Sequence, residues 1–87
     1  MSEEGFQLLS RKDCHLCVEM ESQLETVLPG LGESYSVEDV DSRPEWREKY
    51  GEVVPVLLRD GRAVAKIRVG RRQLERIVRR SRADSPW

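Results

Sequence analysis

The sequence predicts an α/β domain with the element order βαβαββα, in which a four-stranded mixed sheet lies between helices. Apolar residues repeat at helical spacing in residues 17–28 and 74–78, whereas residues 6–10, 35–40 and 53–58 form short apolar or alternating runs. A turn pair at Asp60-Gly61 separates the last two strands. A chain of 87 residues supplies one small domain, which we place at residues 1–80, with a flexible C-terminal tail at 81–87.

The first strand, residues 6–10, leads into a helix that begins near Cys14. Asp13 precedes this helix and is the candidate N-cap, and Pro29-Gly30 ends it. After Cys17 the apolar residues fall on one side of the helix, which predicts that this side faces the core. These residues are Met20, Leu24, Val27 and Leu28.

The second strand, residues 35–40, should run parallel to the first because a helix connects them. The third, residues 53–58, is apolar throughout, so we expect it to be buried, with Pro55 near its start. Asp60-Gly61 has the turn chemistry of a two-residue hairpin. The returning strand alternates, and its expected buried residues are Ala63, Ala65, Ile67 and Val69.

Between the second and third strands the sequence predicts a short helix over residues 45–50. Ser42 and Glu45 have the spacing of a capping box, and Pro44 suits a first helical turn. Trp46 and Tyr50 are four residues apart and should pack inward together.

The C-terminal third of the chain is strongly basic. Residues 1–58 contain 5 Lys or Arg and 13 Asp or Glu, whereas residues 59–87 contain 10 and 3. In the last helix Leu74, Ile77 and Val78 form an apolar side, and most other positions are arginine. We interpret the basic face as a solvated surface or a landing site for an anionic substrate. Nucleic acid is not an expected partner, because no aromatic residue interleaves the arginines before Trp87.

No apolar run approaches the roughly 18 residues of a membrane-spanning helix. The first residues, Met1 to Glu4, lack the basic and apolar regions of a secretion signal. We therefore expect a cytoplasmic protein with no membrane partner. Cytosolic thiols are kept reduced, so a catalytic or metal-binding role is favoured over a structural disulfide for a close cysteine pair there.

Both cysteines lie in Cys14-His15-Leu16-Cys17, at the turn from the first strand to the first helix. A disulfide that closes so short a loop removes little chain entropy, so this pair is suited to being made and broken. At the start of the helix, unpaired N–H groups and the dipole stabilise a thiolate, which makes Cys14 the candidate nucleophile. Cys17, on the apolar side of the helix, is the candidate resolving cysteine.

His15 is a candidate for tuning the redox potential of the pair. A protonated imidazole beside Cys14 would favour its thiolate and make the disulfide more oxidising. The alternative is a surface histidine that has no influence on the thiol.

The order of strand, dithiol turn, helix, Val54-Pro55 and Asp60-Gly61 hairpin resembles the glutaredoxin branch of the thioredoxin fold over residues 6–79. The match is closer to short glutaredoxin-like proteins with Cys-x-Leu-Cys than to the standard enzymes. The resemblance implies a thiol–disulfide oxidoreductase in which Cys14 and Cys17 exchange with a protein disulfide or a glutathione mixed disulfide. It also implies a cis Pro55, with the Val54 backbone free to pair with an extended substrate. An ordinary trans proline at a strand edge is the alternative.

In glutaredoxins a basic residue three positions before the nucleophile meets a glutathione carboxylate, and Arg11 holds that place. A solvated strand-end charge is the alternative interpretation. The Gly-Gly-x-x-Asp segment that holds the other end of glutathione in that family is missing. Here Arg71 and Arg72 start the last helix and could hold a carboxylate instead. We expect no tightly bound cofactor, with glutathione as a possible co-substrate.

Other functions remain open from the sequence. A structural zinc site would need two more ligands, and the only histidine lies inside the Cys14–Cys17 pair, so no metal site is assigned. An iron–sulfur cluster bridging two chains, with glutathione as co-ligand, is a further alternative. So is a non-catalytic thioredoxin-fold module that docks a protein through its basic C-terminal face. The expected state is a monomer, although an uncovered edge strand leaves pairing possible.

Overall fold

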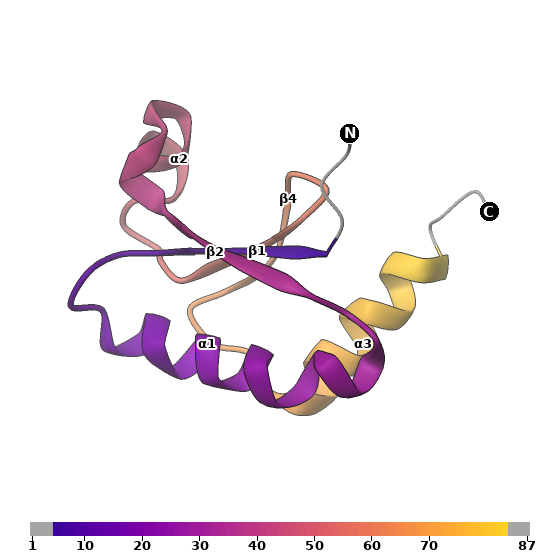
Figure 1. Cartoon of the computed structure of the whole chain (residues 1–87). Helices are drawn as coiled ribbons and strands as arrows, with labels where there is room; N and C mark the ends of the chain where they lie inside the picture. Colours follow the sequence, from indigo (N-terminus) through magenta and orange to yellow (C-terminus); the bar gives the residue numbers. More distant parts are fainter. Residues whose placement is uncertain (1–4, 84–87) are drawn as a thin grey trace.

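The computed structural model describes residues 5–83 and has the predicted element order. Two short 3₁₀ turns, η1 (Pro29–Leu31) and η2 (Val40–Ser42), add to the helices and strands. The main elements, shown in Figure 1, are β1 (Phe6–Ser10), α1 (His15–Val27), β2 (Tyr35–Asp39), α2 (Pro44–Tyr50), β3 (Val56–Arg59), β4 (Arg62–Lys66) and α3 (Arg71–Ala83). Within the described range, no helix combines the length and apolar content needed to cross a membrane.

The sheet has the strand order β2-β1-β3-β4 and is mixed, as predicted. β1 pairs with β2 in parallel, while β3 pairs antiparallel with both β1 and β4. Helices α1 and α3 cover one face of this sheet and α2 lies on the other (Figure 1). The predicted α/β architecture, with helices on both faces, is therefore confirmed.

The core consists of two clusters, one on each face of the sheet. Because side chains alternate along a strand, Leu8 faces α1 and α3 while its neighbour Leu9 faces α2. Leu57 and Leu58 divide in the same way. Each fully buried leucine contributes about 1.5–3 kcal/mol of burial free energy, so these pairs fix which face of each strand meets which helix.

The buried side of α1 agrees with the predicted apolar stripe. Met20, Leu24, Val27 and Leu28 are at most 4% exposed and pack in the cluster that also contains the buried residues of α3. On the other face, Tyr50 is buried and Trp46 packs half-buried against the same cluster.

The hairpin between β3 and β4 forms at Asp60-Gly61, where both residues have positive φ. The expected burial is confirmed at Ala65 and Val69 but is wrong at Ala63. Leu57 pairs with Ala65 while Leu58 pairs with Ala63, which leaves Val64 as an extra residue. This bulge turns Ala63 to solvent and packs Val64 against the α1 and α3 cluster. The strand then ends at Lys66 rather than continuing to Val69.

Two predicted helix caps are also wrong. The N-cap of α1 is Cys14 and not Asp13, which has a φ of 58°. The N-cap of α2 is Arg43, which makes no side-chain capping bond, although Pro44 is the first helical residue as expected. The Ser42 hydroxyl donates instead to the Asp39 carbonyl, within η2, so it is not available for a capping box.

The last helix is longer than predicted. α3 continues through Ala83, so residues 81–83 are helical where the sequence analysis placed the start of a tail. Arg82 in this last turn donates to the Leu31 carbonyl and to Glu33, which ties the end of α3 to the chain before β2. The rest of the expected tail, residues 84–87, lies outside the described residues.

Glu33 links three parts of the fold. Its carboxylate, 10% exposed, accepts from Arg59 at 2.8 Å and from two nitrogens of Arg82 at 3.1 and 2.9 Å. Burial raises the pKa of Glu33, but the two guanidinium groups outweigh it and hold the pKa below its ordinary value of 4.5. The Arg59 guanidinium also lies over the Phe6 ring, 4.6 Å from its centroid.

We predict that Glu33→Gln lowers the free energy of unfolding by about 1–3 kcal/mol at pH 7, because charged hydrogen bonds to a buried carboxylate are lost. A lowered pKa in the folded state stabilises the fold above the unfolded-state pKa, and this stabilisation is lost as the pH falls through the folded-state pKa. Urea unfolding from pH 7 to acid pH should therefore show the difference between parent and variant shrinking. Glu48→Gln, which removes an exposed carboxylate on α2, is the control. A cost of Glu33→Gln that is independent of pH would contradict this account.

Candidate active site

Four loops meet at one edge of the sheet. Ser10 is paired with Asp39, so the parallel strands β1 and β2 end together. Leu9 is paired with Val56, and Val56 with Lys66, so β3 begins and β4 ends at this same edge. The register thus gathers the loops that follow β1, β2 and β4 and the loop that precedes β3.

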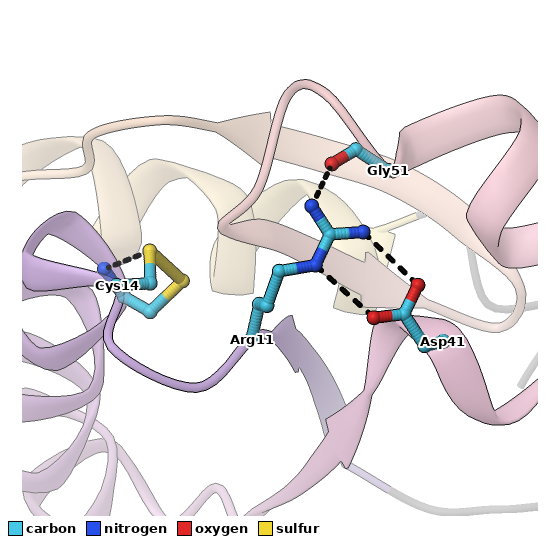
Figure 2. Close-up of a disulfide and its surroundings, with 5 residues drawn as sticks. Arg11, Cys14, Asp41 and Gly51 are labelled. Carbon is cyan, nitrogen blue, oxygen red and sulfur yellow. Dashed lines mark hydrogen bonds and ion pairs between the residues drawn. A yellow bond between two sulfur atoms is a disulfide. The ribbon is translucent and has the colours of Figure 1, made fainter.

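The two cysteines occupy the start of α1 (Figure 2). Cys14 is the N-cap residue, and its sulfur accepts a hydrogen bond of 3.1 Å from the backbone N–H of Cys17. The sulfur therefore takes the place of the side-chain oxygen that usually caps a helix. The two residues form a disulfide, with their Cα atoms 5.2 Å apart.

The cysteines differ in exposure, as the sequence predicts. Cys17 is 4% exposed on the buried side of α1, whereas Cys14 is half-buried. Both border an open hollow of about 600 Å³ formed by the end of β1, the following loop and the first turns of α1. Its lining residues are Ser10, Arg11, Asp13, Cys14, His15, Cys17, Val18 and Glu21. Cys14 is therefore the more accessible of the two cysteines.

Arg11 points away from the disulfide, toward the ends of β2 and α2 (Figure 2). Its guanidinium donates to both carboxylate oxygens of Asp41, at 3.1 and 3.0 Å, and to the Gly51 carbonyl at 2.8 Å. The hydrogen bond from Arg11 lowers the pKa of Asp41 below its ordinary value. Arg11 therefore joins three of the loops at the active-site edge. Contact with a substrate carboxylate stays a prediction for this residue.

His15 does not make the expected contact with the Cys14 thiol. Its imidazole lies 2.7 Å from a carboxylate oxygen of Glu19, one turn further along α1, and the side chain is 86% exposed. Four residues along a helix lie on the same face, so Glu19 is the nearer polar partner on the solvent side. The influence of His15 on the redox potential stays a prediction.

The peptide bond between Val54 and Pro55 is cis, which confirms the prediction and excludes the trans alternative. Pro55 is buried at the start of β3, and its carbonyl accepts from the Ile67 N–H at 2.8 Å. Arg71 and Arg72 are exposed in the first turn of α3. They are not among the residues that line the hollow beside Cys14, so the structure does not bring them to the dithiol.

Two residues of this edge were missed by the sequence analysis, namely Asp41 and Gly51. Asp41 follows β2, and the ends of adjacent parallel strands meet, so an acidic residue there is a possible partner for the Arg11 that follows β1. At position 51 there is little room for a side chain. A Cβ atom would lie 3.3 Å from the Arg11 guanidinium and 2.4 Å from the Arg47 carbonyl oxygen.

Metal binding finds no support in the described part of the chain. Between residues 5 and 83, no three His, Cys, Asp or Glu side chains are grouped closely enough to hold a metal ion. A structural zinc site needs four such ligands.

A cysteine that caps a helix, a buried cysteine partner three residues on and a cis proline at the same sheet edge define a dithiol site of the thioredoxin-fold type. Comparison with known proteins identifies the family. Residues 6–79 match the family described as "Glutaredoxin-like domain (DUF836)", and the chain belongs to this family.

Individual proteins are similar to this chain in sequence or in structure. Uncharacterized protein Rv0508 of Mycobacterium tuberculosis is 33% identical over 91 residues, which cover 99% of this chain and 94% of the relative. Protein XcR50 from X. campestris has a TM-score of 0.72 at 23% identity, with 87% of this chain and 97% of XcR50 covered. Thioredoxin 1 from Thermosipho africanus has a TM-score of 0.58 at 17% identity, covering 90% and 98% of the two chains.

A buckwheat glutaredoxin, solved as a complex with glutathione, has a TM-score of 0.54 at 14% identity, covering 91% of this chain and 72% of the glutaredoxin. At these identities the three solved structures show the fold alone. The chain has the thioredoxin fold.

We predict a small favourable coupling between Arg11 and Asp41, because their pair is bidentate but exposed to solvent. The measurement is a double-mutant cycle from urea unfolding of Arg11→Ala, Asp41→Ala and the double variant. A matched cycle with Lys12→Ala in place of Arg11→Ala should give no coupling, since Lys12 is exposed and forms no ion pair among residues 5–83. Equal coupling in the two cycles would show that general charge, and not this pair, is responsible.

Proposed function

We propose that the protein is a thiol–disulfide oxidoreductase in which Cys14 is the nucleophile and Cys17 the resolving cysteine. The asymmetry of the pair supports this assignment. The Cys14 sulfur caps the helix beside an open hollow, whereas Cys17 is 4% exposed. Membership of the glutaredoxin-like family supports the reaction class.

The reaction proceeds by two sulfur exchanges. In the first, the Cys14 thiolate attacks a substrate disulfide, a mixed disulfide forms, and one substrate sulfur leaves as a thiolate that takes up a proton. In the second, the Cys17 thiolate attacks the Cys14 sulfur and releases the other substrate thiol. Two electrons have then passed from the dithiol to the substrate, and the Cys14–Cys17 disulfide remains. Two molecules of a thiol reductant such as glutathione return the two electrons and leave as one disulfide.

The helix start gives each cysteine its role. The Cys17 N–H that bonds the Cys14 sulfur, together with the positive end of the helix dipole, favours a thiolate on Cys14. This thiolate is the attacking group in the first exchange and the better leaving group when the disulfide is reduced again. Burial of Cys17 disfavours its own thiolate and shields it from external disulfides, so its attack is directed to Cys14.

Protein disulfides are the substrates that we propose, with glutathione as a possible reductant or co-substrate. The buckwheat glutaredoxin was solved as a complex with glutathione, which supports glutathione as a reactant of this protein as well. Asp41 and Gly51 already occupy the Arg11 guanidinium, so a small anionic thiol would have to share it or to use Arg71 and Arg72. We further propose that the Val54 backbone, next to the cis Pro55, pairs with an extended substrate.

We propose that this reaction takes place in the cytoplasm, where glutathione and thioredoxin can reduce the Cys14–Cys17 disulfide after each turnover. The family match favours the redox function over a non-catalytic module that docks through the basic C-terminal face.

We predict that Cys14→Ser lowers the rate of reduction of a small glutathione mixed disulfide by at least about a hundredfold, because the attacking sulfur is removed. Cys17→Ser should form the first mixed disulfide and hold it, which intact-protein mass spectrometry would detect as the added mass of one substrate thiol. A Cys14→Ser variant as active as the parent would overturn the assignment of the nucleophile. Thermal unfolding of both variants in reductant would control for loss of the fold.

A further inference from the structure

Val18 is the exposed apolar residue nearest in sequence to the dithiol. It follows Cys17 directly and is 66% exposed. Among the described residues, the other large apolar side chain with high exposure is Val37 on the edge strand β2. Single exposed apolar residues are common on protein surfaces, so exposure alone carries little weight. Val18 differs from other exposed apolar residues because it lines two hollows.

Val18 borders both the hollow beside Cys14 and a second hollow of about 480 Å³ between α1 and residues 67–69. The second hollow is lined on the α1 side by Val18, Glu19, Met20, Ser22 and Gln23. Val18 lines both hollows, so an extended chain that crosses Val18 can reach from the hollow beside Cys14 to the hollow at the segment after β4. We call the surface formed by these two hollows the α1 track.

The far wall of the α1 track is a tight turn. Ile67 has a φ of 71°, and the Arg68 N–H donates to the Lys66 carbonyl at 2.7 Å, two residues back. A left-handed conformation is strained for a β-branched residue and persists only where the surrounding structure holds it. Here the Ile67 N–H donates to the Pro55 carbonyl at 2.8 Å, and the next apolar residue, Val69, is buried in the core.

This turn places a positive charge on the α1 track. Arg68 lines the second hollow, is exposed, and makes no ion pair with another described residue. Arg71 and Arg72 follow it at the start of α3 and are exposed as well. On the α1 side, the Glu19 carboxylate is paired with His15, and the carboxylates of Asp13 and Glu21 line the hollow beside Cys14. The track therefore offers an apolar contact close to the nucleophile and a cationic contact further away.

We propose that the α1 track docks an extended segment of a protein substrate, with an apolar residue against Val18 and an acidic residue at Arg68. The proposal rests on the proposed function, because the segment must carry the cysteine whose disulfide Cys14 attacks. A polypeptide can cover both hollows at once, whereas a small thiol bound at Cys14 needs only the first. Charge complementarity with Arg68 selects an acidic segment rather than a basic one.

The test uses peptides whose single cysteine is a mixed disulfide with 5-thio-2-nitrobenzoate, so that exchange releases a coloured thiolate. The reference peptide has a leucine next to the cysteine and aspartates beyond the leucine. It is made in two versions, with these residues either before or after the cysteine. Two others replace the leucine by serine or the aspartates by asparagine. We expect Val18→Ser to raise the KM for the leucine peptide roughly three- to tenfold with little change in kcat. Arg68→Gln should abolish the preference for aspartate over asparagine.

The matched controls are Val37→Ser and Arg62→Gln, which change exposed residues of the same types on β2 and at the hairpin, outside the α1 track. They should leave every KM within about twofold of the parent. Equal effects of Val18→Ser and Val37→Ser, or an aspartate preference that survives Arg68→Gln, would overturn the proposal.

A binding measurement separates this proposal from the proposed function. The same peptides with serine in place of cysteine are titrated into the oxidised protein, and backbone amide NMR shifts are followed. Shifts confined to the α1 track, without exchange of any cysteine peptide, would support the docking surface and refute the redox function. Exchange that does not distinguish the peptides, with no shifts along the track, would refute the docking surface alone.

Discussion

The hydrogen bond from the Cys17 N–H to the Cys14 sulfur is the interaction on which the site depends. It makes the Cys14 sulfur the cap of α1, so the same contact that begins the helix also orients the proposed nucleophile. The helix is fixed in turn by its buried side, where Met20 and Leu24 pack under the sheet. The position of one sulfur is thereby set by the packing of a whole helix, and core changes far from the dithiol would reach it through α1.

Two ion-pair clusters hold opposite ends of the sheet. Glu33 precedes β2 and binds Arg59 at the end of β3 and Arg82 near the end of α3. At the active-site edge, Arg11 binds Asp41 and the Gly51 carbonyl. The Glu33–Arg59 pair of the first cluster is less exposed than the Arg11–Asp41 pair, so the active-site edge is held by the more salt-sensitive contact. Looser attachment there suits loops that must admit a substrate.

The sequence was sufficient to predict the element order, the mixed sheet, the dithiol at the start of α1 and, through the family resemblance, the cis Pro55. The helices, the strands and the dithiol turn have local signals in the sequence, whereas the cis proline followed only from the family pattern. The errors arose where a side chain had a choice of partners. Ser42 had the spacing of a capping box but bonds the Asp39 carbonyl. The bulge at Val64 depends on packing against α1 and α3, which the alternation of small apolar residues in β4 does not reveal. The partners of Arg11 follow only from the register of β1 with β2 and the position of α2.

The uneven charge of the chain becomes interpretable once the fold is known. The acidic residues are concentrated in the part that builds β1, α1, β2 and α2, whereas β4 and α3 carry most of the arginines. The second hollow lies between these parts, with α1 on one side and Arg68 on the other. At physiological ionic strength charges act over about 8 Å, so this boundary can orient a substrate that is already in contact more than it can attract one from a distance. Orientation matters for thiol–disulfide exchange, because the attacking sulfur must approach one particular sulfur of the substrate from a restricted direction. A charge boundary at the far end of the α1 track can therefore act on the proposed reaction, by turning a bound disulfide toward the sulfur that caps α1.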